Sequence, residues 1–420
     1  MPPNFKNIVL ITNGFPFGAT NETFLENEIC YLAKYVNNIS IISKINNEKI
    51  KKTQRNVPNN CSVHALNTKS TPIQKIKLLF TIIRRITLFA SLFRIEVIAS
   101  KKNKSWHLAN IQAMFHELAK AFELAYYIKQ NFSNYDKHNT LYYSYWLNSS
   151  ALALAILKSN DTLSYAISRG HGSDIYDNIH PRNYLAHRTF ILNTLDRFFS
   201  VSDFGAKYLK KKYSIKKKIE TSRLGTKEII KNPKAIDINN RLIVSCSHIK
   251  PIKRIEDIIE VLSKTNTPNL TWVHFGGGDN IKNIQHLAKD KLPNINFNID
   301  GPKSNQEIID FYLKNHVSLL INLSSSEGIP VSMMEAMSVG IPILASDVGG
   351  VSEIVNSKTG FLVNAQIDHS KIAKLIDDFF QLDTNMRNIY TKECYQMWKG
   401  IYNRHKNYND FIERINNIKA

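Results

Sequence analysis

Two glutamates, Glu327 and Glu335, stand seven residues apart in the stretch 317–363, which reads VSLLINLSSSEGIPVSMMEAMSVGIPILASDVGGVSEIVNSKTGFLV. A carboxylate accepts two hydroxyl hydrogen bonds at once, which suits the vicinal hydroxyls of a sugar or of ribose. The same two residues could instead be an N-capping acid and an exposed glutamate on a helix surface. The elements that position them bear on this choice.

These elements switch between strand and helix on either side of the glutamates. Residues 317–323 are apolar and typical of a buried strand, and 341–345 form the next such run. Pro330 suits the first turn of a helix between the two strands. We therefore expect Glu327 in a loop at the carboxyl end of a strand, and Glu335 one turn into the helix that follows.

That edge of a parallel α/β sheet is where ligands bind. The N-terminus of a helix offers free N–H groups and partial positive charge, which favour a phosphate. Gly328 would let the backbone come close to a ligand. A phosphate site next to a polyol site suggests a sugar nucleotide as the ligand.

The residues SSSEGIPVSMMEAMSVGIPILASDVGGVSEIV resemble the donor-site signature of glycosyltransferase family 4, whose members are retaining enzymes with the GT-B fold. The signature is an E-x7-E motif followed by a small-residue turn, a strand and a GG turn. The match is dense over 317–363 and weaker over almost the whole chain. It implies that Glu327 binds hydroxyls of the transferred sugar and that Glu335 binds the ribose. It also implies that the backbone at Gly328 and Ile329 approaches the sugar and the diphosphate.

A second segment, 244–262, reads as strand, loop and helix, with Lys253 and Arg254 where the helix begins. Lys253 matches a lysine of the family that contacts the donor diphosphate. The family commonly has an arginine earlier in the loop, where this chain has His248. Arg254 or Lys250 could take the place of that arginine as the second cation that contacts the diphosphate. Two cations on a diphosphate would offset the charge of the leaving group without a metal. The alternative is a solvated helix start.

A glycine run follows the next expected strand, in the sequence FGGGDN at 275–280. A glycine-rich turn alone is weak evidence, and the G-x-G-x-x-G spacing of a nicotinamide-binding turn is missing. In the family this turn borders the nucleotide. The resemblance therefore implies that the backbone of Gly276 and Gly277 lies near the nucleotide.

In the first half of the chain, His171 follows an expected strand in the segment SRGHGSDIYD, which covers 168–177. The family has a histidine at a comparable place beside the reacting sugar, where it makes hydrogen bonds and positions the substrate. A lone histidine can equally be structural. His171 is included among the candidate catalytic residues, with Lys253 and Glu327.

The loop TNGFPFGATNETFLEN, at 12–27, follows the first expected strand. It resembles the family's first loop, which covers the donor phosphates and faces the acceptor. Gly14 and Gly18 are the positions where the backbone could approach a ligand closely. Glu22 is a candidate for the acceptor site.

The composition is that of a globular protein, with 43% hydrophobic and 21% charged residues. The formal charge of +20 points to an anionic partner such as nucleic acid, a membrane surface or a phosphorylated substrate, or reflects only a genomic bias toward Lys, Asn and Ile. The four cysteines have no CxxC spacing, which fits a reduced cytoplasmic setting and no metal site. There is no D-x-D pair, so we expect metal-independent chemistry.

The segment 73–107 is apolar but interrupted by basic residues, among them Arg84, Arg85 and Arg94. A basic amphipathic helix can lie in an anionic membrane interface. It can equally be a core helix whose basic side chains reach solvent. No apolar run in the sequence reaches the ~18 residues of a membrane span. We keep an anionic membrane surface as a possible partner of 73–107.

Strand-like runs alternate with helical ones along the whole chain, which is typical of parallel sheets covered by helices. We predict an α/β protein of the GT-B fold, with two Rossmann-like domains whose parallel sheets face a central cleft. The expected boundaries give an acceptor-binding domain at 1–224, a nucleotide-sugar-binding domain at 225–401 and a terminal helix at 402–420 that crosses back to the first domain. The expected strands cover 7–12, 39–43, 141–146, 164–168, 198–202, 242–247, 271–275, 295–299, 317–323, 341–345 and 361–363.

The predicted function is a retaining, metal-independent glycosyltransferase of bacterial surface polysaccharide or glycoconjugate synthesis. The expected donor is a nucleotide-diphosphate sugar, a UDP-sugar before a GDP-sugar, with no separate cofactor. The acceptor is a hydroxyl of a glycan or of a lipid-linked saccharide. The protein would be cytoplasmic or peripheral on the inner face of the plasma membrane. The alternatives are a sugar-nucleotide epimerase with the GT-B fold and a basic nucleic-acid-binding protein, for which the sequence has no recognised module.

Overall fold

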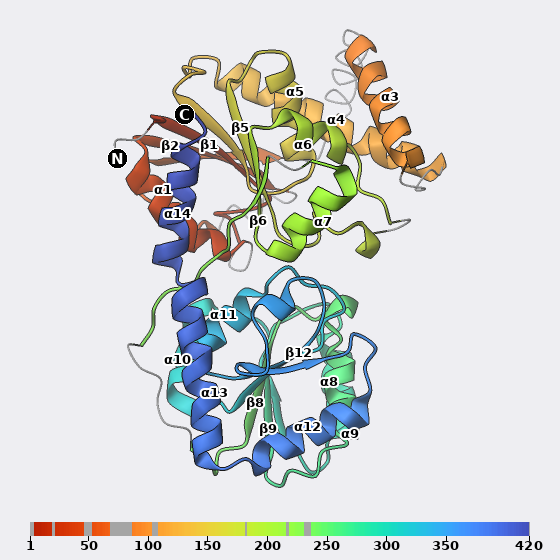
Figure 1. Cartoon of the computed structure of the whole chain (residues 1–420), viewed down its shortest axis with the longest axis vertical. Coiled ribbons are helices and arrows are strands. Elements are labelled where there is room, and N and C mark those ends of the chain that lie inside the picture. Colours follow the sequence, from red (N-terminus) through yellow and green to blue (C-terminus); the bar gives the residue numbers. More distant parts are fainter. Residues whose placement is uncertain are drawn as a thin grey trace. The chain divides into compact units, whose positions relative to one another are not determined.

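The computed structural model describes residues 4–18, 22–45, 53–67, 86–102, 108–180, 183–215, 218–230 and 237–419. The chain divides into two compact units (Figure 1). Unit 1 comprises Met1–Ser222 and Tyr408–Ala420, and unit 2 comprises Arg223–Asn407. The chain therefore passes between the units twice, once in each direction.

Unit 1 is built on a seven-stranded sheet with the order β3-β2-β1-β4-β5-β6-β7, in which every pairing is parallel. The central strand β1 is buried on both faces, because Ile8 and Leu10 belong to one hydrophobic cluster while Val9 and Ile11 belong to another. The strands are β1 (Asn7–Thr12), β2 (Asn38–Ile45), β3 (Cys61–Asn67), β4 (Thr140–Ser144), β5 (Tyr165–Gly170), β6 (Arg197–Ser200) and β7 (Ile219–Thr221).

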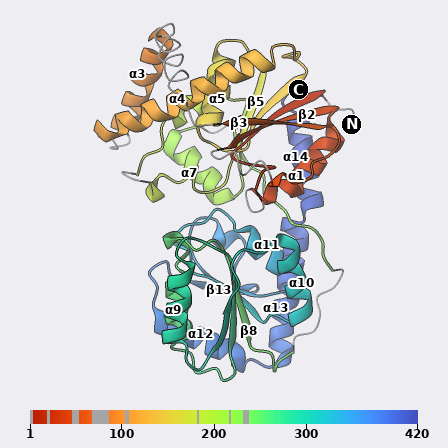
Figure 2. The same cartoon turned by 180° about the vertical axis from the view of Figure 1, so that it is seen from behind.

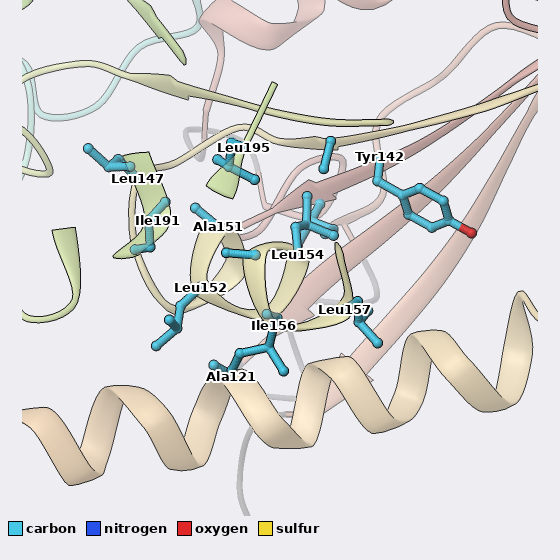
Figure 3. Close-up of a cluster of buried hydrophobic side chains, with 14 of the residues drawn as sticks. Ala121, Tyr142, Leu147, Ala151, Leu152, Leu154, Ile156, Leu157, Ile191 and Leu195 are labelled. Carbon is cyan, nitrogen blue, oxygen red and sulfur yellow. The ribbon is translucent and has the colours of Figure 1, made fainter. Parts of the chain in front are cut away.

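Helices cover both faces of this sheet (Figures 1 and 2). One of them is apolar all round and lies inside the core, where its side chains pack against β4 and the neighbouring helices (Figure 3). Its first residue is preceded by Asn148, whose side chain accepts a hydrogen bond from the Ser150 N–H as an N-cap. The helices are α1 (Phe24–Tyr35), α3 (Ile86–Lys102), α4 (Leu108–Asn131), the core helix α5 (Ser149–Ser159), α6 (Arg188–Thr194), α7 (Asp203–Tyr213) and α14 (Arg404–Asn416).

Unit 2 repeats this plan with a six-stranded parallel sheet in the order β10-β9-β8-β11-β12-β13. Its strands are β8 (Leu242–Cys246), β9 (Thr271–Phe275), β10 (Asn296–Ile299), β11 (Leu319–Asn322), β12 (Ile343–Ser346) and β13 (Gly360–Val363). Its helices are α8 (Ile255–Leu262), α9 (Ile281–Lys291), α10 (Asn305–Asn315), α11 (Val331–Met337), α12 (His369–Gln381) and α13 (Thr384–Met397). The sequence prediction of an α/β protein with two Rossmann-like parallel-sheet domains is confirmed.

Two strands that the sequence prediction missed, β3 and β7, lie at the two edges of the unit 1 sheet. Every residue of β3 is at least partly exposed, so it lacks the apolar run of a buried strand. β7 has three residues, too few to give a pattern. Both strands also have only one neighbour, which weakens the demand for apolar side chains.

The return to unit 1 occurs at 407/408 rather than at the predicted 401/402. The segment before it stays with unit 2 because the Thr226 N–H donates to the Tyr402 carbonyl at 2.9 Å and the Asn407 side chain donates to the Leu224 carbonyl at 2.8 Å. The rest of α14 then contributes Phe411 and Ile415 to the unit 1 core.

Candidate functional site

In unit 2 the strand order reverses between β8 and β11, and this switch point is where a parallel sheet opens a crevice for ligands. The loop after β8 carries Lys253 and the loop after β11 carries Glu327. The Lys253 ammonium donates to the Glu327 Oε1 at 2.5 Å, and the side chain of Asn322 lies 3.4 Å from the same oxygen. Both charged side chains are partly accessible, with exposed fractions of 23% for Lys253 and 10% for Glu327. Two residues 74 positions apart in the sequence thus meet at the predicted edge.

The Glu327 loop is held by a glycine turn from the end of β12. Gly349 has a φ of +57°, and a Cβ there would lie 1.8 Å from the Glu327 carbonyl oxygen. The next residue, Gly350, donates its N–H to the Gly328 carbonyl at 2.9 Å. Only glycine allows this approach, so the GG turn of the motif fixes the loop that carries Glu327 and Gly328. Ile329, which follows, is 5% exposed and anchors the loop in the core.

Glu335 lies in α11, one turn from its start, and is 8% exposed. Burial raises the pKa of the Glu335 carboxyl to about 8, while a hydrogen bond from the Asn305 side chain acts in the opposite direction. Burial raises the pKa of the Cys246 thiol to about 12, and the nearby Glu335 charge acts in the same direction. Burial also raises the pKa of the Tyr312 hydroxyl well above its usual value, again with a contribution from Glu335. The Tyr312 hydroxyl is buried without a hydrogen-bond partner.

The glycine run after β9 packs against the loop after β8. Gly276 has a φ of +149°, and a Cβ there would lie 1.7 Å from the Ser247 carbonyl oxygen. A Cβ on Gly278 would lie 2.4 Å from the Ile249 carbonyl oxygen, and one on Gly277 would lie 2.9 Å from Pro302 Cδ. These glycines therefore allow the loops after β8 and β9 to pack closely against each other. This packing is a structural reason for the glycine run, in addition to the predicted contact with the nucleotide.

Arg254 does not join the Lys253–Glu327 pair. Its backbone has a φ of +50°, and its guanidinium donates to the Ala365 carbonyl at 2.7 Å and lies 4.0 Å from Asp257. The exposed His248 stands in the same loop, where the resembling family commonly has an arginine. Lys253 is thus the residue of this basic group that the fold directs to Glu327.

In unit 1, His171 directly follows β5, as predicted. Its ring packs against three aromatic rings, with centroid distances of 5.1 Å to Phe24, 4.9 Å to Tyr145 and 4.5 Å to Trp146. Neither ring nitrogen makes a hydrogen bond, although Nδ1 lies 3.9 Å from an oxygen of Asp174. The imidazole is therefore positioned by its neighbours, and its two nitrogens are buried without a hydrogen-bond partner.

The loop after β1 contains Gly14, which is buried and whose carbonyl accepts the Phe17 N–H at 2.7 Å. Glu22 organises this loop, because its carboxylate accepts hydrogen bonds from the Asn13 N–H at 2.9 Å, from the Phe15 N–H at 2.7 Å and from the Trp146 indole. With three donors already bound, Glu22 is a structural residue of the loop rather than the acceptor ligand suggested by its sequence position.

Two site residues were not identified from the sequence. Asn322, the last residue of β11, approaches Glu327, and Asn305, the first residue of α10, donates to Glu335. A polar residue ending an otherwise apolar strand could have indicated Asn322. No local signal indicates Asn305, because it comes from another βα unit.

Within the described residues, no group of three or more His, Cys, Asp and Glu side chains is arranged to hold a metal ion. No helix in the described part of the chain combines the length and the apolar character that a membrane crossing requires.

Residues 226–397 match the sequence model of the family described as Glycosyl transferases group 1. The O-antigen biosynthesis glycosyltransferase WbnH of Escherichia coli is 28% identical over 165 residues, which cover 36% of this chain and 46% of that protein. The putative colanic acid biosynthesis glycosyltransferase WcaL of Escherichia coli strain K12 is 26% identical over 224 residues, which cover 51% of this chain and 55% of that protein. The chain spans about half the length of these curated relatives.

Solved structures resemble the chain over nearly its whole length. Sucrose-phosphate synthase (tll1590) from Thermosynechococcus elongatus superposes with a TM-score of 0.71 at 15% identity and covers 99% of both chains. Anabaena Alr3699/HepE, solved in complex with UDP and glucose, superposes with a TM-score of 0.65 at 14% identity, over 98% of this chain and 99% of that chain. At these identities the likeness shows the fold, which is that of GT-B proteins.

Proposed function

We propose that this chain is a retaining glycosyltransferase that moves a sugar from a nucleoside-diphosphate sugar to a hydroxyl of a glycan or lipid-linked acceptor. The observation that carries the proposal is the Lys253–Glu327 pair at the switch point of unit 2, with the buried Glu335 on the helix that directly follows Glu327. This site lies inside 226–397, the residues that match Glycosyl transferases group 1. Relatives named for O-antigen and colanic acid biosynthesis support a role in surface polysaccharide synthesis.

The Lys253–Glu327 ion pair suggests how the donor binds. Lys253 exchanges the Glu327 carboxylate for an oxygen of the donor diphosphate, which is also favoured by the N–H groups at the start of the helix after Glu327. Glu327 is then free to accept hydrogen bonds from hydroxyls of the transferred sugar, while Glu335 accepts those of the ribose. Gly328 and Ile329 supply the backbone that approaches the sugar and the diphosphate.

In the transfer step, the acceptor hydroxyl attacks the anomeric carbon on the face from which the diphosphate departs. The bond between that carbon and the diphosphate oxygen breaks, the bond to the acceptor oxygen forms, and a diphosphate oxygen takes the acceptor proton. Lys253 stabilises the charge that grows on the diphosphate, so that no metal is required. His171, whose ring nitrogens are unbonded, donates to or accepts from a hydroxyl of the reacting sugar.

An anionic membrane surface is the proposed partner of α3 and α4. Ile95 and Ile98 of α3 and Phe115 of α4 are exposed large apolar residues, with exposed fractions of 38%, 58% and 43%. Arg94, beside them, is exposed as well. Apolar side chains next to basic ones are typical of a helix that lies in a membrane interface. Much of the predicted segment 73–107, including Arg84 and Arg85, lies outside the described residues. We place the protein on the cytoplasmic face of the membrane.

Thermal unfolding in the presence of UDP-sugars and GDP-sugars tests the donor first, because a ligand that binds only the folded state raises the melting temperature. We expect the largest shift with a UDP-sugar. The anomeric configuration of the transferred sugar, read by NMR, then tests retention, and activity in excess EDTA tests metal independence. Conversion of the donor alone, without an acceptor, would instead indicate an epimerase, which the named relatives do not favour.

A further inference from the structure

Unit 1 has a cavity of its own at the switch point of its sheet, between β1 and β4. Its volume of about 510 Å³ is in the range of small-molecule sites. Asn13 lines it from the loop after β1, and Trp146 and Asn148 line it from the loop after β4. Glu117 of α4 and Arg188, the first residue of α6, also line it. The position matches that of the Lys253–Glu327 pair in unit 2, but the residues differ.

Arg188 is the unusual residue of this cavity, because it is a buried cation without a carboxylate. It is 4% exposed, and its guanidinium donates to the Ala186 carbonyl at 3.3 Å and to the Asp174 carbonyl at 3.1 Å. Its Nε–H has no acceptor, and no carboxylate in the described part of the chain lies within ion-pairing distance of it. A buried charge held only by neutral carbonyls is costly, so an anion that reaches it is strongly favoured.

The acidic residues that line the cavity are already satisfied. The Asp174 carboxylate accepts N–H groups from Leu147 at 2.9 Å, His171 at 2.8 Å and Gly172 at 3.2 Å. Burial would raise the pKa of Asp174, but hydrogen bonds to His171 and Leu147 and the charge of His171 outweigh it and lower the pKa. Glu117 lies 3.6 Å from the ammonium of Lys120. The buried Glu96 carboxylate accepts a hydrogen bond from the Tyr184 hydroxyl, but it does not line the cavity and is not paired with Arg188. Among the charged side chains that line the cavity, Arg188 is therefore the cation without an ion pair to a described carboxylate.

We infer that this cavity binds a saccharide that carries an oxyanion, and that Arg188 receives the oxyanion. The side chains of Asn13 and Asn148, which are 3.4 Å apart, place amide groups in the cavity for the sugar hydroxyls, and Trp146 adds an aromatic ring. The oxyanion is the carboxylate of an acidic sugar or the phosphate of a phosphorylated or lipid-linked one. The inference rests on the proposed function, because it identifies the acceptor class of that enzyme.

Direct binding to the full chain tests the inference without turnover. Glucuronate, glucose 6-phosphate and glucose are compared by calorimetry at one ionic strength, with UDP binding measured on the same samples. We expect at least one of the anionic sugars to bind about tenfold or more tightly than glucose, because charged hydrogen bonds are the stronger ones. Preference for glucuronate identifies a carboxylate acceptor, and preference for glucose 6-phosphate identifies a phosphate-bearing one.

Two variants locate the binding. Arg188→Gln removes the charge and should abolish the preference, with melting and UDP binding used to establish that the variant is folded. Asn148→Asp keeps an N-cap acceptor for α5 while adding a negative charge at the cavity, so it should abolish the preference even if Arg188→Gln does not fold. Asn38→Asp adds the same charge to an exposed position at the start of β2, at the far end of the strands, and should change nothing.

Equal binding of all three sugars, binding of none of them, or equal effects of Asn148→Asp and Asn38→Asp would overturn the inference. If UDP-sugars neither bind nor react while the anionic sugar still binds through Arg188, the proposed function fails and the site stands. If UDP-sugars bind and react but the anionic preference is missing, the proposed function stands and the site is wrong.

Discussion

The two units share a sheet plan, and each contains a cation–carboxylate pair, but the two pairs are built for different purposes. In unit 1, Arg169 of β5 and Glu28 of α1 are 3.4 Å apart, and both side chains are 0% exposed. In unit 2, Lys253 and Glu327 are 2.5 Å apart, and both remain partly exposed, at 23% and 10%. The same two charge types can therefore form part of a core or of a binding site, depending on what surrounds them.

The Arg169–Glu28 pair is enclosed by other protein groups. Arg169 donates to the Tyr143 hydroxyl and to the Ser222 carbonyl, both at 2.8 Å, and its guanidinium lies 4.3 Å from the ring centroid of Phe411. Ser222 ends the first segment of unit 1, and Phe411 belongs to the segment that returns to it. The pair thus joins the two separate pieces of unit 1. The Lys253 ammonium, by contrast, donates to the partly exposed Glu327, and a ligand can replace that partner.

The largest effect is expected when the buried pair is broken. Arg169→Met leaves the Glu28 carboxylate buried without its cation, which should lower the free energy of unfolding by about 3–5 kcal/mol. Urea unfolding measures this loss. The double variant Arg169→Met with Glu28→Gln should recover a large part of it, because no buried charge remains. A single variant as stable as the natural chain would show that the pair does not hold unit 1 together.

Breaking the accessible pair should affect catalysis instead. Lys253→Ala should reduce turnover by about 10²–10³-fold, because it removes the cation that stabilises the leaving diphosphate. The unfolding free energy should change by less than about 1 kcal/mol, since the pair is partly exposed. Steady-state kinetics and urea unfolding on the same preparation give both values. A variant that loses stability but keeps its turnover would reverse the roles assigned to the two pairs.

The sequence predicted the positions of the unit 2 residues well because the elements that carry them are local. Glu327 and Glu335 are positioned by one strand, one loop and one helix. The spacing of the apolar residues, together with Pro330 and the glycines, predicts this order of elements. The parallel arrangement of strands then brings Lys253 to the same edge without further information. Strand-end position likewise predicted the place of His171.

What the sequence did not reveal depends on packing between distant segments. Asn305 reaches Glu335 from another helix, and Glu22 is occupied by donors from two loops. Arg188 looks like an ordinary helical arginine until its burial is known. The edge strands β3 and β7 carry too little apolar pattern to be recognised. Burial and hydrogen-bond saturation, which separate structural from functional polar residues, are properties of the tertiary fold.

Glu335, in unit 2, should make the stability of the folded chain depend on pH. Its pKa of about 8 is above the usual value, so between about pH 4.5 and 8 the folded chain holds a proton that the unfolded chain has lost. The contribution of Glu335 to stability is therefore full below this window and is lost as the pH rises through it. Glu335→Gln, which keeps an oxygen for Asn305, should stabilise the chain at pH 8.5 by on the order of 1–3 kcal/mol and have little effect at pH 4. Urea unfolding at the two pH values measures this difference. An equal effect at both pH values would show that Glu335 is not a buried carboxyl with a raised pKa.

The smallest effect is expected on the surface, where the two units also differ. Phe115 of α4 lies in the group of exposed apolar residues that we assign to a membrane, whereas Ile389 of α13 is similarly exposed but is not part of it. Phe115→Ser should reduce co-sedimentation with anionic vesicles, and Ile389→Ser should not. Arg94→Gln should weaken binding by about 1 kcal/mol, and the remaining binding should fall as salt rises. Neither variant of unit 1 should alter transfer to a soluble acceptor. Equal sedimentation with neutral vesicles, or equal losses for Phe115→Ser and Ile389→Ser, would identify α3 and α4 as an ordinary packed helix pair with solvated basic side chains.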